Sequence, residues 1–140
     1  MYFGGAMFPI DTKILVVDDA QTIVAQMKMF LGEIGYTSII SAKNLAEATS
    51  QLEESIKSNS PVGLVLCDVN MPGGSGLDFL KHVRRHPSAS ATPFIIVTSE
   101  AEKSTITEAI AGGVTGYLLK PFSKAILQKK LAETWEGLQQ

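Results

Sequence analysis

The stretch VGLVLCDVNMP, residues 62–72, joins a continuous apolar run directly to an aspartate, Asp68. A short apolar run without polar alternation is typical of a strand covered on both faces, as the strands of parallel sheets are. Open parallel sheets bind ligands outside the carboxyl ends of their strands. The stretch therefore predicts a buried strand that ends at a functional edge, with Asp68 on that edge.

Comparable apolar runs recur on both sides of this stretch. Residues 14–17, 94–97 and 117–119 are continuously apolar, and residues 36–41 form a weaker candidate, expected at the edge of the sheet. The segments between the runs carry apolar residues at helical spacing, and Ser75 stands where it could cap a helix. Strands that alternate with helices predict an α/β fold with one five-stranded parallel sheet.

The composition is that of one globular domain. The chain has 140 residues, 45% of them hydrophobic, and its one cysteine, Cys67, excludes an internal disulfide. A net charge of −2 disfavours nucleic acid and acidic membranes as partners, and no apolar run reaches the length of a membrane span. The composition and the single cysteine therefore favour a cytoplasmic location for the protein. Residues 1–12 are expected to be a flexible leader or a cloning remnant, and residues 13–140 the domain.

Chemically distinctive residues follow the predicted strands. Asp18 and Asp19 follow the first strand, Asp68 the third, Thr98 the fourth and Lys120 the fifth, so all should meet at one edge of the sheet. Clustered carboxylates disfavour ionisation of one another, and a hard cation relieves this. Oxygen ligands without histidine or cysteine suit Mg²⁺. A carboxylate nucleophile, a metal, a lysine and a hydroxyl are together the parts that stabilise a phosphoryl group in transfer.

From about Lys13 onward the sequence resembles a response-regulator receiver domain. The resemblance implies a flavodoxin-like (βα)5 fold with strand order 2-1-3-4-5. It rests on motifs that occur in order at strand ends, namely Asp18-Asp19, Asp68-Val69-Asn70-Met71-Pro72 with Gly76, Thr98-Ser99, and Tyr117 with Lys120-Pro121-Phe122.

The resemblance also implies a role for each matching residue. Asp68 would accept the phosphoryl group, and Lys120 would contact the phosphoryl oxygens. Thr98 and Tyr117 would form the switch that responds to phosphorylation. The bond between Lys120 and Pro121 would be cis. The ligands of one Mg²⁺ would be the carboxylates of Asp18, Asp19 and Asp68 and the backbone carbonyl of Asn70, with Asp18 acting mainly through water.

Two further positions favour the chemotaxis type of receiver, called CheY-like. Asn70 and Glu100 stand two residues after Asp68 and Thr98, where such receivers tune hydrolysis of the acyl phosphate. Because the chain ends just past the fifth helix, we expect a stand-alone, monomeric signalling protein rather than an enzyme. Its partners would be a histidine kinase and the flagellar motor switch. The motor-binding face would include Lys103, Tyr117, Leu119 and Lys130.

Two alternatives differ in what happens to the phosphoryl group. A phosphorelay or phosphate-sink protein would exchange it with a histidine phosphotransfer partner. A phosphohydrolase of the haloacid dehalogenase type also uses an aspartate nucleophile with Mg²⁺, but it needs a second aspartate where this chain has Asn70.

Two other features do not require a functional explanation. The basic run from Lys81 to Arg85 is typical of a solvated helix face, and Trp135 could either pack in the domain or contact a partner.

Overall fold

Five parallel strands form the central sheet, in a computed structural model that describes residues 7–99 and 103–139. Their order is β2 (Ile39–Ala42), β1 (Ile14–Val17), β3 (Leu64–Cys67), β6 (Phe94–Thr98) and β7 (Gly116–Leu119). This is the predicted order 2-1-3-4-5, because β6 and β7 are the fourth and fifth strands of this sheet. The weakest predicted strand, β2, lies at its edge as expected.

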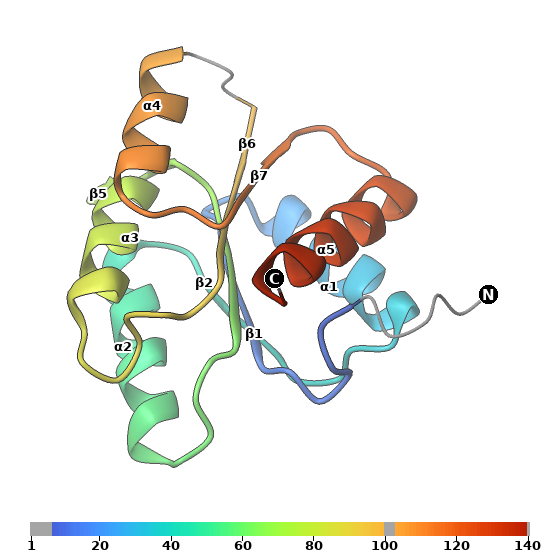
Figure 1. Ribbon diagram of the computed structural model, residues 1–140, viewed down its shortest axis with the longest axis horizontal. Coiled ribbons are helices and arrows are strands. Elements are labelled where there is room, and N and C mark those ends of the chain that lie inside the picture. Colours follow the sequence, from blue (N-terminus) through green and yellow to red (C-terminus); the bar gives the residue numbers. More distant parts are fainter. Residues whose placement is uncertain (1–6, 100–102, 140) are drawn as a thin grey trace.

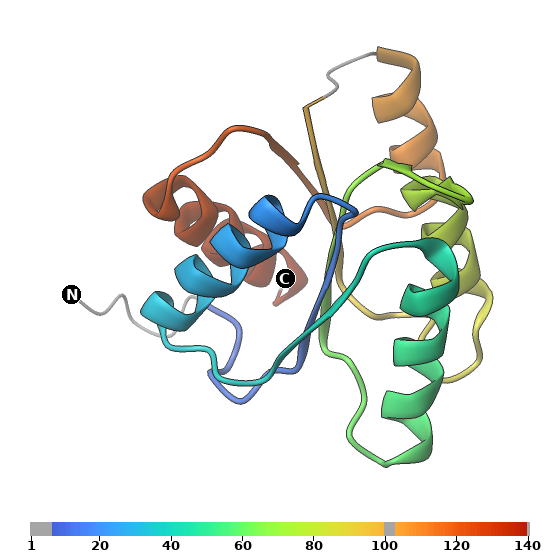
Figure 2. The same ribbon diagram turned by 180° about the vertical axis from the view of Figure 1, so that it is seen from behind.

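Helices cover both faces of the sheet. Helices α1 (Gln21–Ile34) and α5 (Lys124–Leu138) lie on one face, and α2 (Leu45–Lys57), α3 (Gly76–Arg85) and α4 (Lys103–Ala111) lie on the other (Figure 1). Figure 2 shows the same two layers from behind. The buried side chains accordingly form two clusters, one on each face of the sheet. In the part of the chain that the structure describes, no helix is both long and apolar enough to cross a membrane.

Local capping explains where helix α3 begins and ends. The Ser75 hydroxyl accepts hydrogen bonds from the amides of Leu77 and Asp78, and the Asp78 carboxylate accepts one from the Ser75 amide. This reciprocal capping box satisfies amide groups that the first helical turn leaves without partners. The helix ends at Arg85, two residues before Pro87, because proline disfavours the helical conformation of the residue ahead of it. The predicted cap is confirmed.

A short hairpin after β3 was not predicted. Strands β4 (Asn70–Met71) and β5 (Gly74–Ser75) pair antiparallel and are two residues long each, too short for a periodic pattern. Gly73 and Gly74 take φ values of 79° and 153°, which favour glycine, so the turn between the strands depends on them. The hairpin leads from Asp68 directly into α3.

The segment before β1 belongs to the fold where it is described. Phe8 is 2% exposed, its carbonyl accepts a hydrogen bond of 2.8 Å from the Tyr36 hydroxyl, and its ring lies 5.0 Å from that of Trp135. Phe8 therefore packs on α5 and on the buried Tyr36, while the boundary expected at residue 12 stays a prediction. Trp135 packs against the domain. Residues 1–6 lie outside the described residues.

Candidate functional site

Asp18 and Asp68 lie side by side because the strands that precede them are neighbours in register. Val17 at the end of β1 pairs with Cys67 at the end of β3. The amide of Asp68 donates a hydrogen bond of 2.9 Å to the Val17 carbonyl, which extends this pairing one residue beyond the strands. The predicted meeting of residues far apart in sequence thus follows from the parallel register.

Three carboxylates gather at this edge of the sheet. Oxygen atoms of Asp18, Asp19 and Asp68 all lie within 4.8 Å of one another. Asp18 and Asp68 are buried, at 3% and 8% exposure, whereas Asp19 is exposed and borders two surface hollows of about 460 and 470 Å³. Hard oxygen donors, one of them open to solvent, suit Mg²⁺, which keeps several water ligands and takes few protein carboxylates. The residues present therefore fit a magnesium ion.

Lys120 supplies the positive charge of the site. Its Nζ lies 2.6 Å from Asp18 Oδ2 and 3.3 Å from Asp68 Oδ2. Burial by itself lowers the pKa of Lys120, but hydrogen bonds and charge attraction from Asp18 and Asp68 outweigh it, so the pKa is raised. The ammonium is held charged between two buried carboxylates. The Lys120 amide donates to the Thr98 carbonyl, and the Lys120–Pro121 bond is cis as expected.

Backbone amides fix the orientation of both buried carboxylates. The amide of Ala20 donates to Asp18 Oδ1 at 2.9 Å, and the amide of Val69 donates to Asp68 Oδ1 at 2.7 Å. The other oxygen of each carboxylate, Oδ2, is the one that contacts Lys120. The sequence did not predict these donors, because almost every residue has a backbone amide and the residue type does not show which amide will donate.

Gly76 sits directly against the backbone of Asp68. A Cβ atom at position 76 would lie well inside contact distance of the Asp68 carbonyl oxygen and 3.1 Å from Cys67 Sγ. The Gly76 amide donates to the Val69 carbonyl at 2.8 Å, so the start of α3 is tied to the loop that carries Asp68. Only glycine allows this approach. Cys67 is a buried thiol whose pKa is raised by burial and by the charges of Asp68 and Asp18, so it stays protonated.

The other expected site residues are only partly gathered here. Thr98 is fully buried at the end of β6, and Asn70 is exposed in β4. Tyr117, in β7, is half-buried against the cluster under α2, α3 and α4. The expectation for Glu100 falls on a residue outside the described ones.

The expected motor-binding residues come from three elements. Lys103 begins α4 and is exposed, and Leu119 ends β7 with 46% exposure. Lys130 is half-buried on α5, where its Nζ lies 3.5 Å from Glu133 Oε1. Lys103 and Leu119 are therefore open to a partner, whereas Lys130 already has an acidic neighbour.

The fold and this edge define a class of protein: an open α/β domain that presents an aspartate cluster and a lysine at the carboxyl ends of parallel strands. Residues 14–132 match the response regulator receiver domain, and the chain belongs to that family, whose members serve two-component signalling. It is a CheY-like member by similarity. The chain is 34% identical over 119 residues to chemotaxis protein CheY1 of Helicobacter pylori, covering 85% of this chain and 93% of the relative.

Two further comparisons agree with this assignment. Chemotaxis protein CheY-3 of Vibrio cholerae is 35% identical over 126 residues, which cover 90% of this chain and 93% of the relative. The solved structure of chemotaxis response regulator CheY4 of Vibrio cholerae superposes with a TM-score of 0.78 at 31% identity, covering 89% of this chain and 98% of that one. The predicted fold and the predicted resemblance are both confirmed.

Proposed function

We propose that this chain is a phosphoacceptor of a chemotaxis pathway, which takes a phosphoryl group onto Asp68 from a histidine kinase. The observation that carries the proposal is the position of Lys120, whose Nζ lies within 3.3 Å of Asp68 Oδ2 beside a cluster of three carboxylates. An aspartate held between a fixed cation and a metal-binding cluster is suited to nucleophilic attack on a phosphoryl group. Membership of the receiver family and the similarity to CheY proteins support it.

The proposed transfer step uses the carboxylate of Asp68 and the groups around it. An oxygen of Asp68 forms a bond to phosphorus while the bond from phosphorus to the histidine nitrogen of the donor breaks, and that nitrogen keeps the electron pair. The Val69 amide, 2.7 Å from Asp68 Oδ1, holds the carboxylate in one orientation. The Lys120 ammonium neutralises charge on the phosphoryl oxygens. We assign the Thr98 hydroxyl to contact with the phosphoryl group after transfer.

A magnesium ion is part of the proposal. Asp18, Asp19, Asp68 and the backbone carbonyl of Asn70 would hold it, and it would neutralise charge on the phosphoryl oxygens during transfer. Asn70 and Glu100 are proposed to tune how fast the acyl phosphate hydrolyses. Tyr117, half-buried against the buried cluster under α2, α3 and α4, is proposed to move inward when Thr98 is engaged, which would alter the face that includes Lys103, Leu119 and Lys130.

Intact mass spectrometry with acetyl phosphate as the donor tests the phosphoacceptor. With Mg²⁺ the protein should gain the mass of one phosphoryl group, and with EDTA it should gain none. Asp68→Asn should abolish the gain, whereas Asp11→Asn, a change to an exposed aspartate before β1, should leave it intact. Labelling of the Asp68→Asn variant at the wild-type level would show that the nucleophile lies elsewhere. Repeated turnover of the donor far above stoichiometry would favour a hydrolase instead.

Binding measurements separate the chemotaxis output from a phosphorelay. The protein loaded with beryllofluoride, a stable mimic of the phosphoryl group, should bind a motor-switch peptide more tightly than the free protein does. Equal affinity in the two states would contradict the motor output. Rapid return of the phosphoryl group from Asp68 to a histidine phosphotransfer domain, without motor binding, would identify a phosphorelay or phosphate sink.

A further inference from the structure

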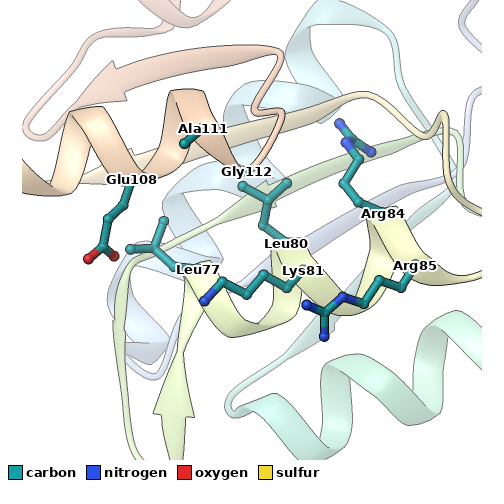
Figure 3. A pocket seen from close by; sticks show the side chains of 8 residues that line it. All are labelled: Leu77, Leu80, Lys81, Arg84, Arg85, Glu108, Ala111 and Gly112. Carbon is teal, nitrogen blue, oxygen red and sulfur yellow. The ribbon is translucent and has the colours of Figure 1, made fainter.

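A groove separates α3 from α4 on the face of the sheet opposite α1 and α5. Its volume is about 480 Å³, within the range of roughly 300–1,000 Å³ that is common for ligand pockets. Figure 3 shows the side chain of Leu80 rising from α3 toward Gly112, the residue after α4, and that of Leu77 lying beside Glu108 of α4. This α3–α4 groove is lined by Leu77, Leu80, Lys81, Arg85, Glu108 and Ala111, together with Arg84 and Gly112.

The charge of the groove is opposite to that of the whole protein. Lys81, Arg84 and Arg85 line it with only one carboxylate, Glu108, although the chain carries a net charge of −2. Lys81 and Arg85 are exposed, and no ion pair involves either of them in residues 7–99 and 103–139. Cations in the last turn stabilise the carbonyl end of a helix, which accounts for Arg84 and Arg85 but not for Lys81 or for the apolar floor.

Arg84 makes one end of the groove rigid without losing its charge. Its guanidinium donates to the carbonyls of Gly113 and Thr92 at 3.0 and 2.7 Å, and also to the Ser90 carbonyl and the Thr115 hydroxyl. All of these acceptors are neutral, so none cancels the positive charge. The groove thus combines a preformed apolar floor with cations on the α3 side.

We propose that the α3–α4 groove binds an acidic amphipathic segment of a partner protein. An apolar side chain of the segment covers Leu77 and Leu80, and carboxylates next to it pair with Lys81 and Arg85. Glu108 repels the carboxylates from the α4 side and so sets the orientation of the segment. This surface is distinct from the one around Tyr117 and Leu119, and it gives the domain a second place to meet a partner.

A titration followed by ¹⁵N-resolved NMR tests the proposal. The probe is a synthetic peptide of alternating leucine and glutamate pairs, compared with a peptide in which lysine replaces every glutamate. The acidic peptide should shift the amide resonances of residues 77–85 and 108–112, and the basic peptide should not. Shifts confined to the surface around Tyr117 and Leu119, or equal effects of the two peptides, would overturn the proposal.

Charge variants decide which residues carry the binding. The double variant Lys81→Glu with Arg85→Glu should bind the acidic peptide about tenfold or more weakly than wild type does. A matched double variant, Lys28→Glu with Lys129→Glu, makes the same charge change at exposed sites on α1 and α5 and should bind like wild type.

Two further measurements complete the test. Glu108→Gln should strengthen binding of the acidic peptide about two- to fivefold. Unchanged affinity in the variant of Lys81 and Arg85 would overturn the proposal, as would equal weakening in both double variants. Co-sedimentation with phosphatidylglycerol vesicles that depends on Lys81 and Arg85, without peptide binding, would identify an anionic membrane as the occupant and would also overturn it.

Discussion

Lys120 is bonded more closely to Asp18 than to Asp68: its Nζ lies 2.6 Å from Asp18 Oδ2 and 3.3 Å from Asp68 Oδ2. The proposed phosphoacceptor therefore does not hold the lysine alone. Asp18 anchors the ammonium from one side and also belongs to the carboxylate cluster that fits Mg²⁺. The same carboxylate contacts the lysine and would also hold the proposed metal, which would link the lysine contact to metal binding.

Removing the ammonium should make the protein more dependent on the metal. Lys120→Ala leaves two buried carboxylates without their cation, and without Mg²⁺ it should lower the free energy of unfolding by about 1–3 kcal/mol. Added Mg²⁺ should raise that free energy more in the variant than in wild type, because the metal takes over the charge of the ammonium. Urea unfolding with and without Mg²⁺ measures both effects. Lys124→Ala, which removes an exposed pair with Glu33, serves as the control and should change stability by less than about 1 kcal/mol.

Gly76 should be intolerant of even a methyl group. In Gly76→Ala the new Cβ collides with the Asp68 carbonyl, so the loop that carries Asp68 must move. We expect a loss of about 2 kcal/mol or more in stability and slower labelling by acetyl phosphate. Gly32→Ala, in helix α1 with open space at its Cβ, is the matched control and should be neutral or stabilising by up to about 1 kcal/mol. Wild-type labelling rates and stability in Gly76→Ala would contradict this account of the site.

Arg84 should matter for stability far more than its neighbour Arg85. Arg84 ties α3 to the loops before β6 and before β7 through its hydrogen bonds to backbone carbonyls and Thr115. Arg84→Ala removes the guanidinium donor from all of these acceptors and should cost about 1–3 kcal/mol by chemical denaturation. Arg85→Ala changes an exposed side chain and should cost less than about 0.5 kcal/mol. Equal costs for the two variants would mean that the Arg84 contacts add nothing.

Tyr36 should make the fold sensitive to alkali. Burial raises the pKa of Tyr36 from 10.0 to about 12. Between these two pH values the hydroxyl is therefore protonated in the folded protein but ionised in the unfolded chain. The stabilisation is complete below pH 10.0 and is lost as the pH rises toward about 12. Tyr36→Phe removes the hydrogen bond to the Phe8 carbonyl, which costs about 1 kcal/mol of stability. Because phenylalanine does not ionise, the variant should not show this loss of stability at high pH.

Unfolding curves of wild type and Tyr36→Phe at several pH values test this sign. The stability of wild type relative to the variant should fall by about 1.4 kcal/mol for each pH unit above the ordinary pKa of tyrosine. Because the two proteins share every other ionisable group, the comparison isolates the tyrosine. A difference that stays constant through this range would show that the Tyr36 hydroxyl is not shielded from water.

Local patterns were enough to predict much of the fold. The apolar run that ends at Asp68, and the similar runs elsewhere, predict buried strands because a strand covered on both faces has no polar alternation. Ser75 was a reliable helix cap because capping involves only residues within one helical turn. The hairpin at Asn70 escaped prediction since its strands are too short to show a period. The burial of Phe8 was not predicted because its contacts, Tyr36 and Trp135, lie far along the chain.

The sequence by itself determined that Asp18, Asp19, Asp68 and Lys120 meet, because residues that follow parallel strands share one edge of the sheet. Tertiary structure alone decided how they meet. The preference of Lys120 for Asp18, the amides that orient the carboxylates, and the charged groove between α3 and α4 depend on distances of a few ångströms between distant parts of the chain. Residue type and spacing carry the topology of the site, whereas its electrostatics arise only once the helices and strands have packed.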